Sequence, residues 1–175
     1  MYIISRCLLG CNCKYNGGNN KNDDVIEFCK TRDYVTICPE TDAGLTSPRA
    51  PAEIQMPCSG EFRVTDREGN DLTEQFMMGA EISLQAVMDK LKAIGKDAVI
   101  EGAILKANSP SCGSGIIYDG SFTGNKTPGD GMFTALLKKA FKNKAESVDD
   151  MRTDTVFSGD FMIIDEHSVS ELVNK

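Results

Sequence analysis

Short apolar runs in this chain lead directly into turns that carry a cysteine, and this pattern constrains the fold more than any other feature. Residues 2–6 and 34–37 are rich in apolar and β-branched side chains, so each run predicts a short buried strand. The first run leads into Cys7 and the second into Cys38. Both cysteines are therefore expected at strand ends.

Helical patterns separate the predicted strands. Apolar residues spaced 4, 4, 3 and 4 positions apart form one stripe of a long helix that starts near Asp71, in a pattern resembling a capping box, and ends at Gly95. Asn22 or Asp23 is suited to cap an earlier helix over about residues 24–32. Strands that alternate with helices favour a parallel, three-layer α/β sheet, which is the fold class that we expect. The other predicted elements are strands within 98–106 and 157–164, a helix around 133–140 and a short helix over 168–173.

A Pro-rich segment of about twenty residues follows Cys38 and is expected to be a loop. Connections of that length in a compact domain are commonly functional or disordered, and the charged residues here favour function. Residues 61–66 then alternate in character and predict a small strand or hairpin.

Length and composition favour one globular domain without a membrane span. The chain has 175 residues, of which 41% are hydrophobic and 26% charged. No apolar run approaches the roughly 20 residues that cross a bilayer, and the N-terminal run is too short for a signal peptide, so a cytoplasmic location is expected. A net charge of −7 disfavours nucleic acid as a partner, because nucleic-acid binders present basic surfaces.

The chain has seven cysteines, an odd number that excludes complete pairing in disulfides. Without a secretion signal, reduced thiols are expected. Cys29 lies in a helical pattern and is expected to be a small core residue, whereas Cys58 is expected in a surface turn. Cys11 is left without a role.

The remaining cysteines lie in turns from distant parts of the chain. Loops at the carboxyl ends of strands form the ligand sites of open α/β sheets, and thiolates brought together there suggest a soft-metal or iron–sulfur site. We expect Cys7, Cys38 and Cys112 to be the ligands. Cys13 is the alternative ligand or a neighbouring thiol. The competing interpretation is buried or turn cysteines without a metal, since the chain has no C-x-x-C pair.

Motifs in a fixed order link this chain to a known family. They are Cys-Leu-Leu-Gly at 7–10, Cys-Pro-Glu at 38–40, a Pro-rich motif at 44–53, Ser-Pro-Ser-Cys-Gly at 109–113 and Gly-Asp-Gly at 129–131. With them the chain resembles the DUF523 family, which includes the thiouracil desulfidases. The resemblance runs from Met1 to about Ala140 and implies a Rossmann-like α/β fold. We expect a single domain over 1–175, with 141–175 as a C-terminal extension.

The resemblance also implies a cofactor and a reaction. The cofactor is an oxygen-sensitive [4Fe–4S] cluster held by only three protein thiolates, which leaves the fourth iron open to the sulfur of a substrate. The reaction is hydrolytic removal of sulfur from a thiolated pyrimidine such as 2-thiouracil, giving uracil and sulfide. The partner implied is thus a small thiolated base. The sequence departs from the family pattern at Arg6, Lys14 and Asn16, where Ala, Arg and Asp are usual, and Lys14 cannot offer the bidentate contact of a guanidinium.

Addition of water requires a group that manages protons. Glu40, two residues after Cys38, is the expected catalytic carboxylate, with a solvated loop carboxylate as the alternative. Ser109 is expected to hydrogen-bond the pyrimidine or the attacking water, and Ser111 to contact substrate or cap the turn; for both serines a turn-forming role is equally expected. The other substrate-binding candidates are Arg49 and Glu53, for which a structural ion pair is the alternative, and Gly113 through its backbone amide.

Two other functions fit these residues. A metal- or redox-sensing module would close the thiolates fully around zinc or iron and would have no substrate cavity. Desulfuration of thiolated tRNA would need a basic face, and the lysines between 138 and 144 are expected to be the solvated end of a helix instead. The extra domain of the tRNA-acting family branch is not expected here. His167, the sole histidine, is expected at the surface, and Asp130 is expected to cap the helix that follows it.

Overall fold

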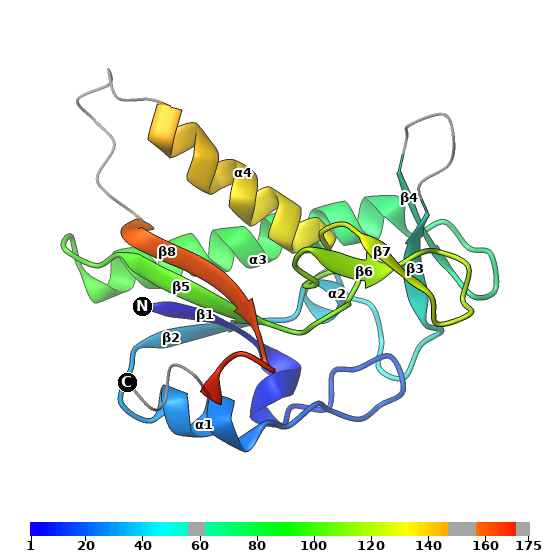
Figure 1. Cartoon of the computed structure of the whole chain (residues 1–175), viewed down its shortest axis with the longest axis horizontal. Coiled ribbons are helices and arrows are strands. Elements are labelled where there is room, and N and C mark those ends of the chain that lie inside the picture. Colours follow the sequence, from blue (N-terminus) through cyan, green and yellow to red (C-terminus); the bar gives the residue numbers. More distant parts are fainter. Residues whose placement is uncertain (56–61, 147–156, 171–175) are drawn as a thin grey trace.

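The computed structural model describes residues 1–55, 62–146 and 157–170. Its centre is a parallel sheet with the strand order β2-β1-β5-β8 (Figure 1). The strands are β1 (Tyr2–Ser5), β2 (Tyr34–Ile37), β5 (Ile100–Leu105) and β8 (Phe157–Asp165). The parallel α/β fold predicted from the alternation of strands and helices is confirmed.

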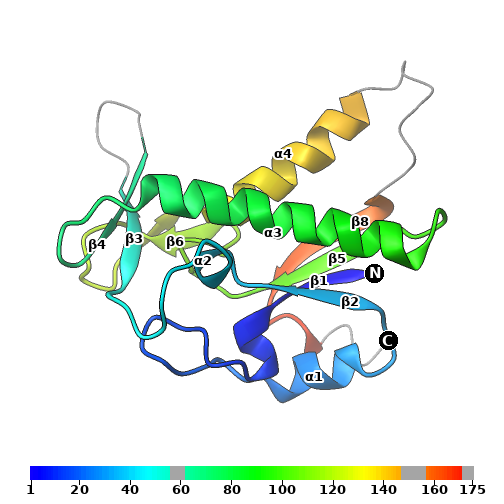
Figure 2. The same ribbon diagram turned by 180° about the vertical axis from the view of Figure 1, so that it is seen from behind.

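Helices cover both faces of this sheet and make three layers (Figures 1 and 2). The 3₁₀ helix η1 (Arg6–Leu9) and α1 (Asp23–Cys29) lie on one face, and α3 (Thr73–Ile94) and α4 (Met132–Glu146) cover the other. Successive residues of a strand point to opposite faces. Accordingly, Ile3 belongs to the core under α3 and α4, whereas its neighbour Ile4 belongs to the core under α1.

The long helix α3 confirms the predicted apolar stripe. Leu84 of the stripe is partly buried, and the other four positions are buried: Phe76, Ala80, Val87 and Leu91. The start of the helix differs from the predicted capping box, because Asp71 Oδ1 accepts the backbone N–H of Thr73 at 2.9 Å in a local turn. Gly95 ends the helix with a φ of 139°, as expected.

A short helix, α2 (Pro39–Asp42), follows Cys38 and packs against α3. The two helices approach so closely that only glycine fits at Gly79 of α3. A Cβ added there would lie 2.0 Å from the carbonyl oxygen of Pro39. This contact fixes the Cys-Pro-Glu turn against the rigid long helix.

The Pro-rich segment is not the long loop that the sequence predicts. It contains α2 and strand β3 (Ala52–Gln55), which pairs antiparallel with β4 (Arg63–Asp66) inside the predicted 61–66 strand. A second hairpin is formed by β6 (Ile116–Tyr118) and β7 (Lys126–Pro128). Such short elements carry too few residues to show a period. Both hairpins lie beyond the carboxyl ends of the central strands (Figure 1).

Other predicted features have mixed outcomes. Strand β8 confirms the strand expected over 157–164. Residues 171–173 of the helix expected over 168–173 lie outside the described residues, as does Cys58. Asp130 is not the expected cap: its carboxylate accepts the N–H of Gly115 at 2.8 Å and pairs with Lys138 at 2.7 Å. Within the described parts of the chain, no helix is long and apolar enough to cross a membrane.

Candidate active site

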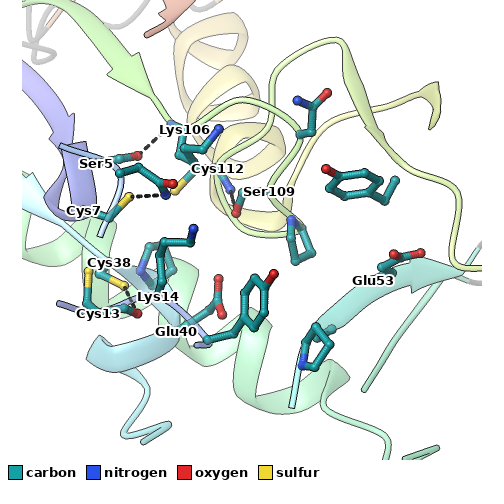
Figure 3. A pocket seen from close by; sticks show the side chains of 18 of the residues that line it. Ser5, Cys7, Cys13, Lys14, Cys38, Glu40, Glu53, Lys106, Ser109 and Cys112 are labelled. Atoms are coloured by element: carbon teal, nitrogen blue, oxygen red, sulfur yellow. Dashed lines mark hydrogen bonds between the residues drawn. The ribbon is translucent and has the colours of Figure 1, made fainter. Parts of the chain in front are cut away.

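A cavity of about 540 Å³ opens at the carboxyl ends of β1, β2 and β5, between the sheet and the two hairpins (Figure 3). At one end lie four cysteines; we call this the cysteine end, and its sulfurs belong to Cys7, Cys13, Cys38 and Cys112. At the other end lie residues of the hairpins; we call this the hairpin end, and it includes Glu53, Tyr118 and Phe122. The cavity occupies the edge of the sheet where parallel topology favours a ligand site.

The cysteines reach the cavity from separate strands. Cys7 lies in η1 immediately after β1, Cys38 directly follows β2, and Cys112 lies in the turn after β5. Cys13 comes from the loop after η1, and its thiol hydrogen-bonds to both Cys7 and Cys38. The cavity therefore contains all three predicted ligands and the alternative.

Hydrogen bonds among these thiols give them different pKa values. The bond with the Cys13 thiol is the largest influence that lowers the pKa of Cys38 to about 6, against the opposing effect of burial. The same neighbour is the largest influence that lowers the pKa of Cys7. The pKa of Cys13 is correspondingly raised by its bonds to Cys38 and Cys7, and burial raises the pKa of Cys112. The lowered pKa values of Cys38 and Cys7 favour the thiolate, the form that binds metals.

Polar groups surround the cysteine end as well. The side-chain amide of Asn20 lies 3.5 Å from Cys7 Sγ. Ser5 is buried, and its hydroxyl accepts the backbone N–H of Lys106 at 3.0 Å (Figure 3). The same side chain hydrogen-bonds to Cys112. Hydrogen bonds of this kind tune sulfur-ligated metal sites.

Glu40 is held in the cavity rather than solvated. Its Oε2 accepts a hydrogen bond from Arg49 Nε at 3.0 Å, and its Oε1 accepts one from Ser111 Oγ at 3.0 Å. The side chains of Glu40 and Arg49 are only 16% and 10% exposed. These contacts fix the direction of the carboxylate, so the alternative of a solvated loop residue is wrong.

Arg49 also connects the loops around the cavity. Its guanidinium donates to the carbonyl oxygens of Cys13 at 3.1 Å and Thr46 at 2.9 Å, besides its contacts to Glu40. The ion pair between Arg49 and Glu53, the alternative to substrate binding, does not form. Arg49 pairs with Glu40 instead, because α2 brings Glu40 beside it.

The two serines of the Ser-Pro-Ser-Cys-Gly motif have different positions. Ser109 lines the cavity, and its Oγ accepts the backbone N–H groups of Ser111 at 3.1 Å and Cys112 at 3.2 Å. Ser111 is 1% exposed and is not part of the cavity lining. Ser109 therefore caps the turn, and Ser111 orients Glu40 rather than facing a substrate.

Glu53 and Gly113 also differ from each other. Glu53 lines the hairpin end of the cavity, and its Oε2 accepts the backbone N–H of Phe122 at 3.0 Å. Gly113 lies behind the cavity wall, where its N–H already donates to the carbonyl of Ser109 at 2.8 Å. An added Cβ at Gly113 would lie 2.8 Å from that oxygen. The amide of Gly113 is thus engaged in the turn, and the expected contact with substrate is not supported.

Lys106 and Glu166 were missed by the sequence reasoning. Lys106 follows β5, lines the cavity and forms an ion pair with Glu166, which follows β8. Its charge is a minor contribution to the lowered pKa of Cys7, after hydrogen bonds with Cys13 and Asn20. Its position at the end of a predicted strand could have identified Lys106 from the sequence. No feature of the sequence near Glu166 indicates that Glu166 pairs with Lys106.

The departures from the family pattern are visible at the edge of the site. Arg6 pairs with Asp42 at 2.9 Å and donates to Thr41 Oγ1 at 3.2 Å, so it ties η1 to α2. Lys14 lines the cavity with its ammonium 5.8 Å from the centre of the Tyr15 ring. Asn16 accepts the N–H of Gly18 at 3.1 Å in a local turn.

The donor set at the cysteine end is entirely sulfur. The sole histidine, His167, is 73% exposed beside Glu166, as expected for a surface residue. Among the described residues, no three Cys, His, Asp or Glu side chains are placed to hold a single metal ion. Thiolates from several turns are the usual ligands of iron–sulfur clusters, which are larger than one ion. The donor type at the cysteine end is therefore compatible with an iron–sulfur cluster.

Elsewhere, Cys29 matches its expected core position, and Cys11, to which no role was assigned, lies outside the site. Cys29 is buried in the core under α1, and Cys11 is exposed outside the cavity lining.

The fold and the site together define the class of this protein. It is a parallel α/β protein with a thiol-lined cavity at the carboxyl ends of its strands. The chain belongs to the 2-thiouracil desulfurase family, whose model matches residues 2–147. It is 38% identical over 145 residues to the uncharacterized protein YbbK of Bacillus subtilis (strain 168), a match that covers 80% of this chain and 91% of that protein.

A solved structure gives the same assignment. The fold is similar to that of the [4Fe–4S]-dependent thiouracil desulfidase TudS, with a TM-score of 0.70 and 32% sequence identity. The similarity covers 99% of this chain and 95% of that one. The family resemblance inferred from the ordered motifs is confirmed.

Proposed function

We propose that this protein removes sulfur hydrolytically from a thiolated pyrimidine such as 2-thiouracil, with the aid of a [4Fe–4S] cluster. The observation that carries the proposal is the meeting of four thiols and one oriented carboxylate, Glu40, in a single cavity. Membership of the 2-thiouracil desulfurase family and the similarity to TudS support it.

Cys7, Cys38 and Cys112 would hold the cluster, because each enters the cavity from the end of a different parallel strand. Cys13, which hydrogen-bonds to two of them, is the neighbouring thiol. When bound, the cluster supplies a Lewis-acidic iron that takes the thione sulfur and makes the ring carbon more electrophilic.

Glu40 would accept a proton from the attacking water. Arg49 donates two hydrogen bonds to Oε2, from Nε and Nη2, and Ser111 donates one to Oε1, so Oε1 keeps a lone pair for the water. The water oxygen replaces sulfur on the ring carbon, and both protons of the water leave with the sulfur as H₂S. Because no electrons are gained or lost, the reaction needs neither an oxidant nor a reductant.

Ser109 and Glu53 would orient the pyrimidine. The oxygen of Ser109 is occupied by two backbone N–H groups, so its hydroxyl proton remains available to the base or the water. Glu53 is held through one oxygen by Phe122, so its carboxylate is available to accept a ring N–H. These contacts would place the C–S bond toward the cysteine end.

A small thiolated base suits this cavity better than thiolated tRNA does. Phosphate-binding surfaces carry an excess of lysine and arginine, whereas this chain has a net charge of −7. We also propose that the whole chain works as one domain, because β8 of the C-terminal extension pairs with the central strand β5.

The test begins with purification without oxygen and reconstitution with iron and sulfide. The visible spectrum and the iron content report the cluster, and addition of 2-thiouracil followed by assays of sulfide and uracil reports the reaction. Equal amounts of both products are expected. A matched control is Cys11→Ser, which removes an exposed thiol outside the cavity and should leave both measurements unchanged.

The result also separates the alternatives. A reconstituted cluster that releases no sulfide from 2-thiouracil would contradict the proposed activity. Retention of full cluster content in Cys7→Ala, Cys38→Ala and Cys112→Ala would contradict the proposed ligands.

A further inference from the structure

Lys106 is fixed at the cysteine end by several contacts. Its ammonium donates to the carbonyl of Ala107 at 3.1 Å and forms an ion pair with Glu166. Its backbone N–H donates to Ser5, the same residue that hydrogen-bonds to Cys112. Figure 3 shows Lys106 and Ser5 beside Cys112 and Cys7.

Glu166 is a buried carboxylate brought in from the other end of the chain. It directly follows β8, is 8% exposed, and its second oxygen accepts the backbone N–H of Ala107 at 2.8 Å. Both of its oxygens therefore hold the segment that follows β5. Parallel pairing of β8 with β5 brings the two strand ends together.

Stability alone does not account for this arrangement. Ordering a long, flexible lysine side chain costs conformational entropy. A buried ion pair also loses hydration, so it contributes little to stability unless its geometry serves another role. An ammonium has three N–H donors, and partners among the described residues take two of those on Lys106. One donor remains for a ligand in the cavity.

We propose that Glu166 positions Lys106 to donate a hydrogen bond and positive charge to the sulfur that is released at the cysteine end. The inference rests on the proposed function. Negative charge develops on sulfur as the carbon–sulfur bond breaks, and a preorganised cation beside it stabilises that state. Lys106 is then the group that contacts the leaving sulfur, and Glu166 acts through it as a positioning residue.

The proposal gives the C-terminal segment a role in the site. The family match ends at residue 147, and the match to the Bacillus subtilis relative covers 80% of this chain. Glu166 lies beyond the family match, on the segment whose strand extends the sheet past β5. The segment therefore completes the cysteine end in addition to extending the sheet.

The experiment compares Lys106→Met, Lys106→Arg and Glu166→Gln with the intact protein after anaerobic reconstitution. For Lys106→Met we expect kcat for 2-thiouracil to fall about tenfold or more with KM changed less than about threefold. The reduction potential of the cluster should also become more negative, because a nearby positive charge is lost. Lys106→Arg should restore most of both values, and Glu166→Gln should lie between.

The matched control is Lys30→Met, which removes a cation from an exposed ion pair with Glu27 on α1 and should change neither measurement. The inference is overturned if Lys106→Met keeps the potential and kcat of the intact protein. It is also overturned if Lys106→Arg shows the same changes in kcat and reduction potential as Lys106→Met, or if both variants lose the cluster. Packing of the side chain rather than its charge would then explain the loss of function. If the intact protein holds a cluster but releases no sulfide, the proposed function fails, and the potentials still decide whether Lys106 acts on the cysteine end.

Discussion

The two ends of the cavity are built differently. The cysteine end is formed by turns at the ends of parallel strands, and hydrogen bonds connect its cysteine side chains to one another. The hairpin end is formed by β3, β6 and the loop after β6, and each of these strands belongs to a small two-stranded sheet. Under the proposed function, the central sheet would fix the chemistry, whereas the hairpins would determine which ring enters.

The largest effect is expected at the cysteine end. Cys7→Ala, Cys38→Ala and Cys112→Ala should each abolish cluster retention and sulfide release, because each removes one of three thiolates. Iron per protein and the visible spectrum after anaerobic reconstitution measure this. Cys29→Ala, in the core under α1, serves as the matched cysteine control and should keep its cluster. A clear difference in cluster content among the three cysteine variants would instead identify Cys13 as a substitute ligand.

Glu40→Gln should keep the cluster but slow the reaction by about a hundredfold or more, because the amide cannot accept the proton of water. The amide can still accept one hydrogen bond from Arg49, so the fold should be preserved. Sulfide release under saturating 2-thiouracil measures kcat, and the visible spectrum confirms the cluster. Activity near that of the intact protein would remove Glu40 from the proton transfer.

Gly79→Ala should destabilise the protein by about 1–3 kcal/mol, because the new methyl group collides with the backbone at Pro39. At a helix position with open space, glycine-to-alanine substitution stabilises a protein. The sign of the change in folding stability therefore tests the contact between α2 and α3. Denaturant unfolding of the cluster-free protein measures it. Ala86→Ser, at an exposed position of α3, is the matched control. A more stable Gly79→Ala protein would contradict the close approach of α2.

At the hairpin end, Glu53→Gln should raise KM about tenfold and change kcat less than about threefold, since a charged hydrogen bond to substrate is weakened while the chemistry is untouched. Initial rates across a range of 2-thiouracil concentrations separate the two constants. If Glu53→Gln lowered kcat as much as Glu40→Gln does, the proposed division between chemistry at one end and substrate binding at the other would be contradicted.

The smallest effect is expected from Cys29, whose pKa is raised to about 11 by burial. In the unfolded chain the thiol ionises near its ordinary value of 9.0, so the contribution of Cys29 to folding stability is present below that pH and is lost as pH rises toward 11. Denaturant unfolding between pH 8 and about pH 11 should show a steeper loss of stability in the intact protein than in Cys29→Ala. Identical pH profiles of stability for the two proteins would show that Cys29 ionises as freely in the folded state as in the unfolded chain.

Sequence periodicity predicts the main elements well because they are long or strongly patterned. The stripe of α3 and the apolar run of β2 are both found where expected. Helix α2 and strand β3 escape detection because each spans four residues without the apolar, β-branched run that marks the equally short β2. Less than two turns of helix, or two residues per face of a strand, carry no measurable period.

Local motifs likewise predicted which residues meet but not how they contact one another. Glu40 and Arg49 share one segment and were both expected in the site, yet their pairing depends on the turn that α2 makes. Ser109 and Ser111 carry the same side chain two positions apart. Only the folded turn determines that one caps it and the other reaches Glu40.

The sequence by itself determined the alternation of strands and helices and the placement of cysteines at strand ends, because both depend on neighbouring residues. Tertiary structure decided the rest. The bond between Ser111 and Glu40 joins residues 71 positions apart, and the contact between Lys106 and Glu166 joins residues 60 apart. Such contacts are set by the order and register of the parallel strands, which no local pattern of side chains encodes.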